Sequence, residues 1–576
     1  MSTLGQTQRV TLSFEAVKRF RFDWTDVEDA THYRLLENPD GLSGFSAVGG
    51  DVGQGTETLV LEVPLYARAN AQYILQDCRG EGLQEECNDS DILSVTGTLV
   101  DSIGYFKASN TDGGDRFGSA LSLSADGNTL AIGAPLEGGT ATGINGDQSG
   151  NTAEESGAVY IFGRNAGIWT QQAYVKASNT DAGDRFGEAV SLSADGTTLA
   201  VGASSESSSA DGIDGDQSNN DLNGSGAVYI FSRNEGAWAQ QAYIKASNPD
   251  ELDFFGGALS LSGDGNTLAV GAGEESSSAT GVDGDQNNND VEGAGAVYIF
   301  NRSEGDWTQQ AYIKASNTDR GDHFSSALSL SADGNTLAVS TIFEDSNAIG
   351  VDGDQGNNDT FNAGAVYIYS HSQGAWTQQA YVKASNTDAG DYFGYALSLS
   401  GDGNILAVGA GEEDSRATGI GGDQNNNDAA RAGAVYIFNR NGGVWAQRAY
   451  VKASNSQAGD QFGEALNLSE DGNTLAVGAF DDDSSATGIN GDETLNDMGE
   501  SGAVYVYKYS EGSWSQQSYV KASNTDVNDE FGLAIGLSAE GATLAVGAYF
   551  EDSNATGIDG DQTNNDAKYS GAVYVY

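Results

Sequence analysis

Oxygen-bearing side chains recur at one fixed place in seven successive segments of this chain of 576 residues. In the second segment Asp214, Asp216, Asn220 and Asp221 alternate with glycine and small polar residues. Such alternation lets a short loop curl around a hard cation, and Ca²⁺ takes about six to eight oxygen ligands. No histidine or cysteine lies in these loops, which argues against zinc and softer metals. The pattern therefore predicts calcium binding.

The same oxygen donors return in the later segments, so we expect several calcium sites. The candidate ligands are Asp214, Asp216, Asn220, Asp221, Asp283, Asp285, Asn289, Asp290, Asp352, Asp354, Asn358, Asp359, Asp423, Asp428, Asn490, Asp492, Asp497, Asp559, Asp561, Asn565 and Asp566. Segments two, three, four and seven keep every carboxylate. Segments five and six lose one, to Gly421 and Asn490, and the first loses two, to Asn145 and Thr152. The alternative is a solvated acidic turn, because Asn and Asp are ordinary loop formers.

Two further acidic positions recur beside each loop. One follows the second apolar run of every segment, from Glu137 to Glu551. The other lies two residues before a repeated phenylalanine, from Asp115 to Asp529. We expect the second position to form an Asx-type turn with nearby backbone amides. The alternative is a carboxylate that is shared with the neighbouring metal loop.

These positions keep their spacing because the whole segment repeats every 69 residues. The phenylalanine that opens each copy stands at Phe117, Phe186, Phe255, Phe324, Phe393, Phe462 and Phe531. Each copy has four runs of strand character, and an Asp-Gly-type turn joins the first two in most copies. A fixed period of this size indicates stacked supersecondary units. The sequence therefore predicts an all-β fold, a seven-bladed β-propeller of four-stranded antiparallel blades.

The ends of the repeated region predict how the ring closes. The last copy stops at Tyr576 without a fourth strand, whereas residues 94–110 align with the fourth-strand region 163–179. We therefore predict that residues 104–107 complete the seventh blade and that the propeller occupies residues 94–576. The long loops join the second and third strands of each copy. We expect them to lie on the same face of the ring as the loops that lead to the next blade.

Three short motifs resemble the FG-GAP repeat of integrin α-subunit propellers, in the version common in bacterial surface and secreted proteins. They are Phe-Gly at the first strand, Gly133-Ala134-Pro135 after the second, and Gly-Ala-Val-Tyr in the third. The resemblance implies a propeller fold and an extracellular adhesion or ligand-binding role. The fourth copy departs from the pattern at Ser325 and Ser340. Integrin-like propellers hold calcium between strands one and two, where this chain has a tight turn, so that site does not carry over.

Residues 1–93 lie outside the repeat and contain six short runs of strand character. Trp24, Leu61, Tyr66 and Tyr73 resemble the pattern of a fibronectin type III domain, which implies a small β-sandwich in front of the propeller. The alternative is an irregular β extension of the propeller.

The chain has two cysteines, Cys78 and Cys87, and both lie in the front region. Paired, they would join a hairpin in an oxidising compartment. The alternative is two free thiols.

The composition limits the partners of this protein. Its 83 acidic and 26 basic residues give a formal net charge of −57, which repels nucleic acid and anionic membranes. No apolar run reaches the roughly 18 residues of a spanning helix. The first residues lack the pattern of an export signal. We nevertheless expect a secreted or cell-surface protein, without membrane insertion.

A few positions vary among otherwise uniform copies, which points to recognition. One set of aligned positions, or column, reads Arg116, Arg185, Phe254, His323, Tyr392, Gln461 and Glu530. Two further columns, directly after the second strand of each copy, also vary. Aromatic and arginine side chains are the usual binding hot spots. We therefore predict a ligand patch made by Phe480, Tyr549, Phe550 and Arg116. The alternative is that these rings pack against the loops or the front domain.

The remaining repeated side chains fit a structural role better than catalysis. We expect the tryptophans from Trp169 to Trp514 and the lysines from Lys107 to Lys521 to provide packing between blades and a salt-paired surface. The three histidines lie in no nucleophile motif, and the carboxylate pairs recur sevenfold. We therefore expect a non-enzymatic extracellular calcium-binding adhesion or ligand-binding protein, with a glycan or protein ligand. The alternatives are a structural surface protein that self-assembles into a layer or filament and, less favoured, a hydrolase or lyase that acts on glycans.

Overall fold

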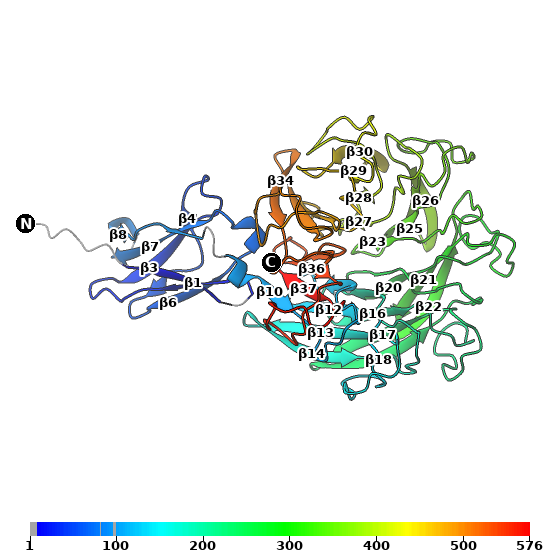
Figure 1. Ribbon diagram of the computed structural model, residues 1–576, viewed down its shortest axis with the longest axis horizontal. Coiled ribbons are helices and arrows are strands. Elements are labelled where there is room, and N and C mark those ends of the chain that lie inside the picture. Colours follow the sequence, from blue (N-terminus) through cyan, green and yellow to red (C-terminus); the bar gives the residue numbers. More distant parts are fainter. Residues whose placement is uncertain (1–8, 16, 81, 96–98) are drawn as a thin grey trace, which may run out of the picture.

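The structure is a computed structural model that describes residues 9–15, 17–80, 82–95 and 99–576. A small front domain lies beside a ring of β-sheets (Figure 1). The described helices are three short 3₁₀ turns, η1 (Leu65–Ala67), η2 (Gly82–Gln84) and η3 (Leu99–Ser102). Among the described residues, no helix has the length and hydropathy that a membrane crossing requires. The chain is thus all-β, as predicted.

The front domain consists of two sheets that share one core. The first orders β1 (Thr11–Glu15), β2 (Arg19–Asp23) and β6 (Thr58–Glu62); the second orders β4 (Ser46–Ala47), β3 (His32–Asn38), β7 (Gln72–Arg79) and β8 (Glu86–Asp89). Short strands β5 (Val52–Gly53) and β9 (Leu93–Ser94) pair with β3 and β7. Phe20 and Phe22 from the first sheet meet Tyr73 from the second in edge-on contacts. Alternation of buried and less buried residues along β2 and β3 produces this shared core.

The two cysteines form a disulfide bond, which confirms that prediction. Cys78 and Cys87 are directly opposite each other in the antiparallel pair β7–β8. The sequence analysis missed β8, because Glu86–Asp89 is polar and lacks the apolar alternation of an ordinary strand.

Seven four-stranded antiparallel sheets follow among the described residues, and they form the blades of the ring (Figure 1). Blades one to three are β11 (Ala120–Leu123), β12 (Thr129–Ala134), β13 (Ala158–Asn165), β14 (Ile168–Val175); β15 (Ala189–Leu192), β16 (Thr198–Ala203), β17 (Ala227–Asn234), β18 (Ala237–Ile244); and β19 (Leu259–Leu261), β20 (Thr267–Ala272), β21 (Ala296–Ser303), β22 (Asp306–Ile313). Blades four and five are β23 (Leu328–Leu330), β24 (Thr336–Thr341), β25 (Ala365–Ser372), β26 (Ala375–Val382); and β27 (Leu397–Leu399), β28 (Ile405–Ala410), β29 (Ala434–Asn441), β30 (Val444–Val451). Blades six and seven are β31 (Leu466–Leu468), β32 (Thr474–Ala479), β33 (Ala503–Ser510), β34 (Ser513–Val520); and β35 (Ala534–Leu537), β36 (Leu544–Ala548), β37 (Ala572–Val575), β10 (Gly104–Phe106).

The seventh blade joins the two ends of the repeated region. Strand β10 pairs antiparallel with β37, so that Tyr105 lies opposite Tyr574. The side chains of β10 are buried, and Phe106 contacts Phe162 and Trp169 of the first blade. A strand from the start of the repeated region therefore completes the last sheet.

A circle of backbone hydrogen bonds joins the turns between the first and second strands of neighbouring blades. The amides of Ala125, Ala194, Gly263, Ala332, Gly401, Asp471 and Ala539 donate to carbonyls of the next turn at 2.9 to 3.1 Å, and the last of these bonds returns from Ala539 to Ala125. Six of the seven turns are capped by an aspartate, and the seventh has Glu540 at that position. In blade one the Asp126 carboxylate accepts from the Asn128 amide, and Gly127 takes a φ of +66°.

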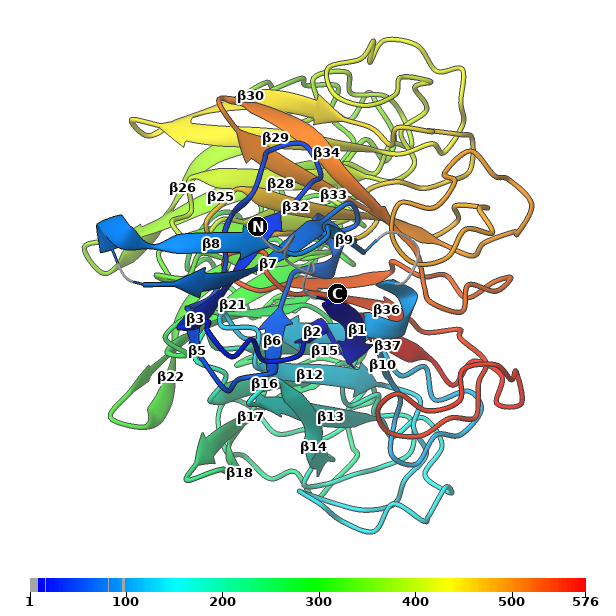
Figure 2. The same ribbon diagram turned by 90° about the vertical axis from the view of Figure 1, so that its left-hand side faces the viewer.

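The long loops between second and third strands lie on one face of the ring together with the loops that lead to the next blade. Asn220 of the first kind of loop donates to Asp181 of the second kind, which places both on the same face. Figure 2 shows the long loops on the right-hand side of that view. We call this the loop face.

The front domain packs against the rim of the ring. Its residues Leu65 and Tyr66 share a buried cluster with Val520 and Ala522 of the sixth repeat unit. Lys18, which is buried, donates from Nζ to the Ala542 carbonyl at 2.5 Å and to Thr543 Oγ1 at 2.7 Å. The Lys18 amide also donates to the Ser102 carbonyl at 2.9 Å, so the same residue contacts the segment that leads into β10.

Candidate functional site

The repeated aspartate of each long loop caps its own turn. The Asp216 carboxylate accepts from the Ser218 amide at 3.0 Å, and equivalent bonds occur in the other copies. The capping aspartates are Asp147, Asp216, Asp285, Asp354, Asp423, Asp492 and Asp561. These side chains are exposed. The constancy of this column has a structural cause, because the cap defines the turn.

The column two residues earlier lies at a left-handed backbone position. Its φ values are +55° at Asp214 and +71° at Gly421, a region that Asn, Asp and Gly tolerate best. The Asp214 carboxylate also accepts from the Tyr243 amide at 3.0 Å. Backbone geometry therefore explains why this column contains only Asp, Asn and Gly.

The repeated asparagine ties the long loop to its neighbour. Nδ2 donates to an aspartate of the adjacent loop at 2.7 to 3.3 Å in five copies, at Asn220, Asn289, Asn358, Asn427 and Asn565. The last predicted column is exposed, at Asp221, Asp290, Asp359, Asp428, Asp497 and Asp566. It lies beside the others at the tip of the loop.

The long loops use the predicted calcium ligands in their own hydrogen bonds, and among the described residues no three carboxylates of one loop lie within 4.8 Å of one another. Their donor set of carboxylate and amide oxygens has the chemistry that Ca²⁺ requires. Among the described residues, the one cluster of three metal-ligating side chain types within 4.8 Å is His32, Cys78 and Glu85. Cys78 is in the disulfide, so its sulfur is not available to a metal. A calcium ion in the long loops would share its ligands with the turn caps.

The acidic residue after the second strand forms a buried ion pair, which the sequence analysis missed. Lys176 Nζ lies 2.8 Å from the Glu137 carboxylate, and both side chains are almost fully buried. The pairs are Lys107–Glu551, Lys176–Glu137, Lys245–Glu206, Lys314–Glu275, Lys383–Glu344, Lys452–Glu413 and Lys521–Asp482. The expectation that these lysines form a salt-paired surface is therefore wrong. Lysine is rarely buried unless it is paired, and its partner lies 39 residues away in the chain.

The aspartate before each repeated phenylalanine is buried, and in six copies its carboxylate accepts a hydrogen bond from a backbone amide. The Asp184 carboxylate accepts from the Asp181 amide at 3.0 Å, three residues earlier in the chain. The backbone role was predicted, although the bond goes to a preceding amide and not to a following one. Burial raises the pKa of Asp184 to about 7, against the opposing effect of this hydrogen bond.

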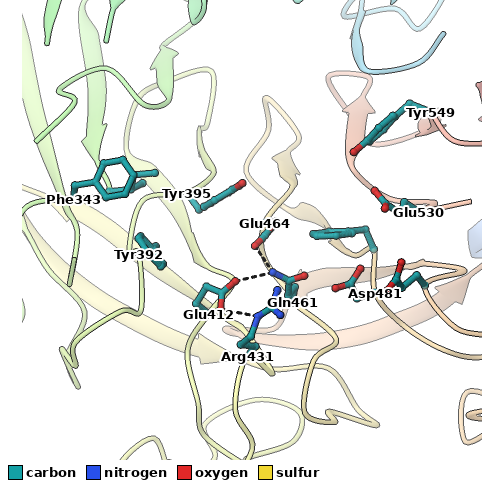
Figure 3. A pocket seen from close by; sticks show the side chains of 13 residues that line it. Phe343, Tyr392, Tyr395, Glu412, Arg431, Gln461, Glu464, Asp481, Glu530 and Tyr549 are labelled. Carbon is teal, nitrogen blue, oxygen red and sulfur yellow. Dashed lines mark hydrogen bonds and ion pairs between the residues drawn. The ribbon is translucent and has the colours of Figure 1, made fainter. Parts of the chain in front are cut away.

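An open pocket of about 700 Å³ lies on the loop face over units four to seven. Its rings are Phe343, Tyr392, Tyr395, Phe480 and Tyr549, and its acidic side chains are Glu412, Glu464, Asp481, Glu500 and Glu530. Figure 3 shows Glu464 in the middle, between Phe343 and Tyr395 on one side and Glu530 and Tyr549 on the other. We call it the aromatic pocket.

The structure brings two of the four predicted ligand residues into the aromatic pocket. Phe480 and Tyr549 line it. Arg116 and Phe550 are not among the lining residues; the Arg116 guanidinium lies 5.1 Å from the Phe550 ring centroid and 5.6 Å from that of Tyr549. Phe550 also contacts Tyr569 at 4.9 Å. Arg116 and Phe550 therefore support Tyr549 from outside the pocket.

All 13 lining residues come from five columns that vary among the copies. The sequence analysis identified three of these columns. It missed the one that holds Tyr395 and Glu464 and the one that holds Arg431 and Glu500. Both missed columns also vary among the copies, which is the signal that identified the other three. The first of them reads Ser119, Glu188, Gly257, Ser326, Tyr395, Glu464, Leu533. The pocket is thus built where the repeat departs from itself.

Two of these columns carry large side chains on left-handed backbone. The φ values are +50° at Tyr392, +53° at Gln461, +51° at Glu530 and +57° at Arg431. Glycine would take this conformation without strain, and it does so at Gly224 and Gly293 of the same column as Arg431. The same conformation occurs outside the pocket, at Arg116, Arg185 and Phe254 of the column of Tyr392, so it belongs to the repeat as a whole.

Three acidic side chains of the pocket, Glu464, Glu530 and Asp481, have raised pKa values. Burial, with Glu412 and Asp481 nearby, raises the pKa of Glu464 to about 8. Burial also raises the pKa of Glu530 to about 7, and that of Asp481 to about 6. Gln461 Nε2 donates to Glu412 at 2.7 Å and to Glu464 at 2.8 Å, and Arg431 pairs with Glu412 at 2.8 Å. These bonds hold Glu412 and Glu464 at the pocket floor (Figure 3).

Comparison with known proteins identifies the repeat. Four stretches match the FG-GAP repeat, at residues 169–231, 238–300, 376–438 and 445–507. They start 69 or 138 residues apart, in the frame of the sequence repeat. The stretch between the second and third matches, residues 307–369, is not matched. In this copy Ser325 and Ser340 replace the glycines of Phe-Gly and Gly-Ala that the other copies have.

Searches of curated proteins and of solved structures give no relative that indicates a function. No curated protein matches the chain. The structure of RRP9 WD40 repeats is similar with a TM-score of 0.39 and 8% identity, over 82% of this chain and 96% of that one. The chicken CNTN1 FN1-FN3 domains give a TM-score of 0.13 and 9% identity, over 42% and 98%. At these TM-scores neither likeness adds to what the sheets and the repeat matches show. The chain is a β-propeller repeat protein in which four stretches match the FG-GAP repeat.

Proposed function

We propose that this protein is a non-enzymatic, extracellular ligand-binding or adhesion protein, and that the aromatic pocket is its binding site. One observation carries the proposal: every lining residue belongs to a column that varies, whereas the surrounding repeat is nearly constant. Variation along the whole lining of a concave surface supports recognition over packing. The FG-GAP matches support the same class of function, and the disulfide in the front domain supports an extracellular location. The front domain belongs to this proposal as a fibronectin type III-like module.

The ligand is a glycan or a protein, and an array of both, probed in millimolar calcium, tests the proposal. We expect a hit that is lost in Phe480→Ala and in Tyr549→Ala. Ser204→Ala is the matched control, because Ser204 occupies the column of Phe480 in the second unit, outside the pocket. Phe550→Ala should weaken binding less, because Phe550 acts on the ligand only through Tyr549.

Other outcomes would replace the proposal. A hit that survives both ring substitutions would move the binding site away from the pocket. Sedimentation that shows assembly of the protein by itself would favour the structural role. Turnover of an acidic glycan, lost in Glu464→Gln, would make the pocket an active site.

We also propose that the long loops bind calcium. The support is their exposed oxygen donors and the net charge of −57, which favours cations. Asp216→Asn separates this role from the turn cap, because an amide oxygen still accepts from the Ser218 amide while the charge is lost. We expect calorimetry on chelator-treated protein to detect calcium and Asp216→Asn to reduce the heat. Absence of both calcium heat and a calcium-dependent rise in melting temperature would refute this.

A further inference from the structure

The aromatic pocket has more carboxyl groups than basic side chains that could pair with them. It is lined by five carboxylates and one basic side chain, Arg431. Arg431 is already paired with Glu412 at 2.8 Å. The other four acids, Glu464, Asp481, Glu500 and Glu530, have no ion-pair partner among the described residues. An anionic ligand would be repelled by this lining.

Glu464 shows most clearly what the pocket lacks. Glu464 is 8% exposed, and its Oε1 accepts a hydrogen bond from Gln461 Nε2 at 2.8 Å. No hydrogen bond to Oε2 is found among the described residues. A Cβ on Gly411 would lie 2.1 Å from Glu464 Cγ, so the absence of a side chain at Gly411 leaves room for Glu464 in this conformation. Burial, together with Glu412 and Asp481, raises the pKa of this carboxyl to about 8, although the charge of Arg431 acts in the opposite direction.

The buried glutamates elsewhere in the propeller provide the contrast. Glu137 and Glu206 are each neutralised by a lysine at 2.8 Å, and the same pairing recurs around the ring. The fold therefore has a standard solution for a buried carboxylate, which it uses in every blade. At Glu464 that solution is missing, and the carboxylate borders an open cavity instead.

The rings of the pocket supply the rest of a cation site. Phe343, Tyr392 and Tyr395 lie on one side of Glu464 and Tyr549 lies on the other (Figure 3), and Phe480 also lines the pocket. The face of an aromatic ring is electronegative and attracts cations, and such rings recognise alkylated ammonium groups in particular. The rings would contact the methyl or methylene groups while Glu464 and Glu530 balance the charge. A neutral sugar would stack on the rings but would leave that charge unmatched.

We propose that the aromatic pocket binds a small organic cation with an alkylammonium head group. This inference rests on the proposed ligand-binding role of the pocket and names the chemical class of its ligand. The carboxylates make the site selective for charge, and the rings make it selective for alkylated nitrogen.

Calorimetric titration of the full chain with choline and with tetramethylammonium tests the proposal. The neutral isostere of choline, 3,3-dimethylbutan-1-ol, is the control ligand. We expect the cations to bind at millimolar concentrations or below, and the neutral isostere to bind about tenfold more weakly or not at all. Glu464→Gln should weaken choline binding by about tenfold, and Phe480→Leu should weaken it as well.

Glu188→Gln is the matched control, because Glu188 holds the column of Glu464 in the second unit, outside the pocket. It should leave choline binding unchanged. Circular dichroism and melting curves of each variant show whether it is folded. Equal binding of choline and its neutral isostere, or unchanged binding in folded Glu464→Gln, would overturn the proposal, as would no binding of either cation.

The array separates this inference from the proposed function. If a neutral glycan binds and is lost in Phe480→Ala while choline does not bind, the cation proposal fails and the binding role stands. If cations bind and are lost in both Glu464→Gln and Phe480→Leu, both hold. If neither the array nor the titration with cations detects binding that depends on Phe480, both the cation proposal and the proposed binding role of the pocket fail.

Discussion

Removal of one buried lysine should destabilise the propeller far more than removal of an exposed arginine. Lys245 Nζ lies 2.8 Å from the Glu206 carboxylate and 2.6 Å from Ser225 Oγ, and the side chain is fully buried. Lys245→Met keeps the length of the side chain but leaves Glu206 as a buried carboxylate without a cation. Breaking a buried pair in this way costs about 3–5 kcal/mol.

The size of the effect on melting follows from the size of the propeller. Unfolding entropy is about 2 cal/mol/K per residue, so residues 104–576 give about 1 kcal/mol/K. A loss of 3–5 kcal/mol therefore lowers the melting temperature by about 3–5 °C. Scanning calorimetry or thermal circular dichroism measures the shift. The double variant Lys245→Met/Glu206→Gln should recover much of it, because the uncompensated charge is gone.

An exposed pair on the same propeller is the control. Arg320 and Glu292 form an ion pair in which the side chains are 75% and 76% exposed. Arg320→Met should change stability by less than about 1 kcal/mol. If Lys245→Met melts with the wild type, or if the double variant is no more stable than the single one, the reasoning about an uncompensated buried charge is wrong.

Three further predictions concern other parts of the fold. Deletion of residues 104–107 should lower the melting temperature of the whole propeller in one cooperative transition, and a truncated protein that melts unchanged would show that the ring does not need this strand. Because the pKa of Asp184 is about 7 in the folded protein and near 4 when unfolded, the folded state binds more protons between these values, so stability should fall as pH rises from about 4 to 7. Melting curves across this range should be flatter for Asp184→Asn, and an equal slope would contradict the shift. Replacing Cys78 and Cys87 by serine should destabilise the front domain by about 2–3 kcal/mol while the propeller transition stays in place, and calorimetry that shows one joint shift would mean that the two parts unfold together.

The blades were predictable because the signal was repeated seven times. The spacing of Phe117 and its equivalents, the Asp-Gly-type turns and the alternating strands all indicate the same unit, and local and global signals agree. Strand β8 was missed because Glu86–Asp89 is polar and gains its place by pairing with β7. Pairing of this kind depends on tertiary contacts that local pattern does not contain.

The site was predictable only in part, and the reason differs from residue to residue. Phe480 and Tyr549 stood out because large rings replace small residues of their column. Glu464 did not stand out, because an acidic side chain is ordinary in so acidic a chain, and only its burial makes it exceptional. The lysines were misassigned for the opposite reason: Lys245 is an ordinary surface residue type until Glu206 is seen beside it.

The pairing of β10 with β37 has a consequence for how this protein is made. Translation releases β10 before any blade, whereas its partner emerges only after the six intervening sheets. During that interval a short apolar strand waits with an open edge, and such edges invite association with other chains. The front domain emerges first and is joined to β10 by the segment that Lys18 contacts. An independently folded sandwich at this point would keep the waiting strand tethered and partly shielded until the ring is ready to receive it.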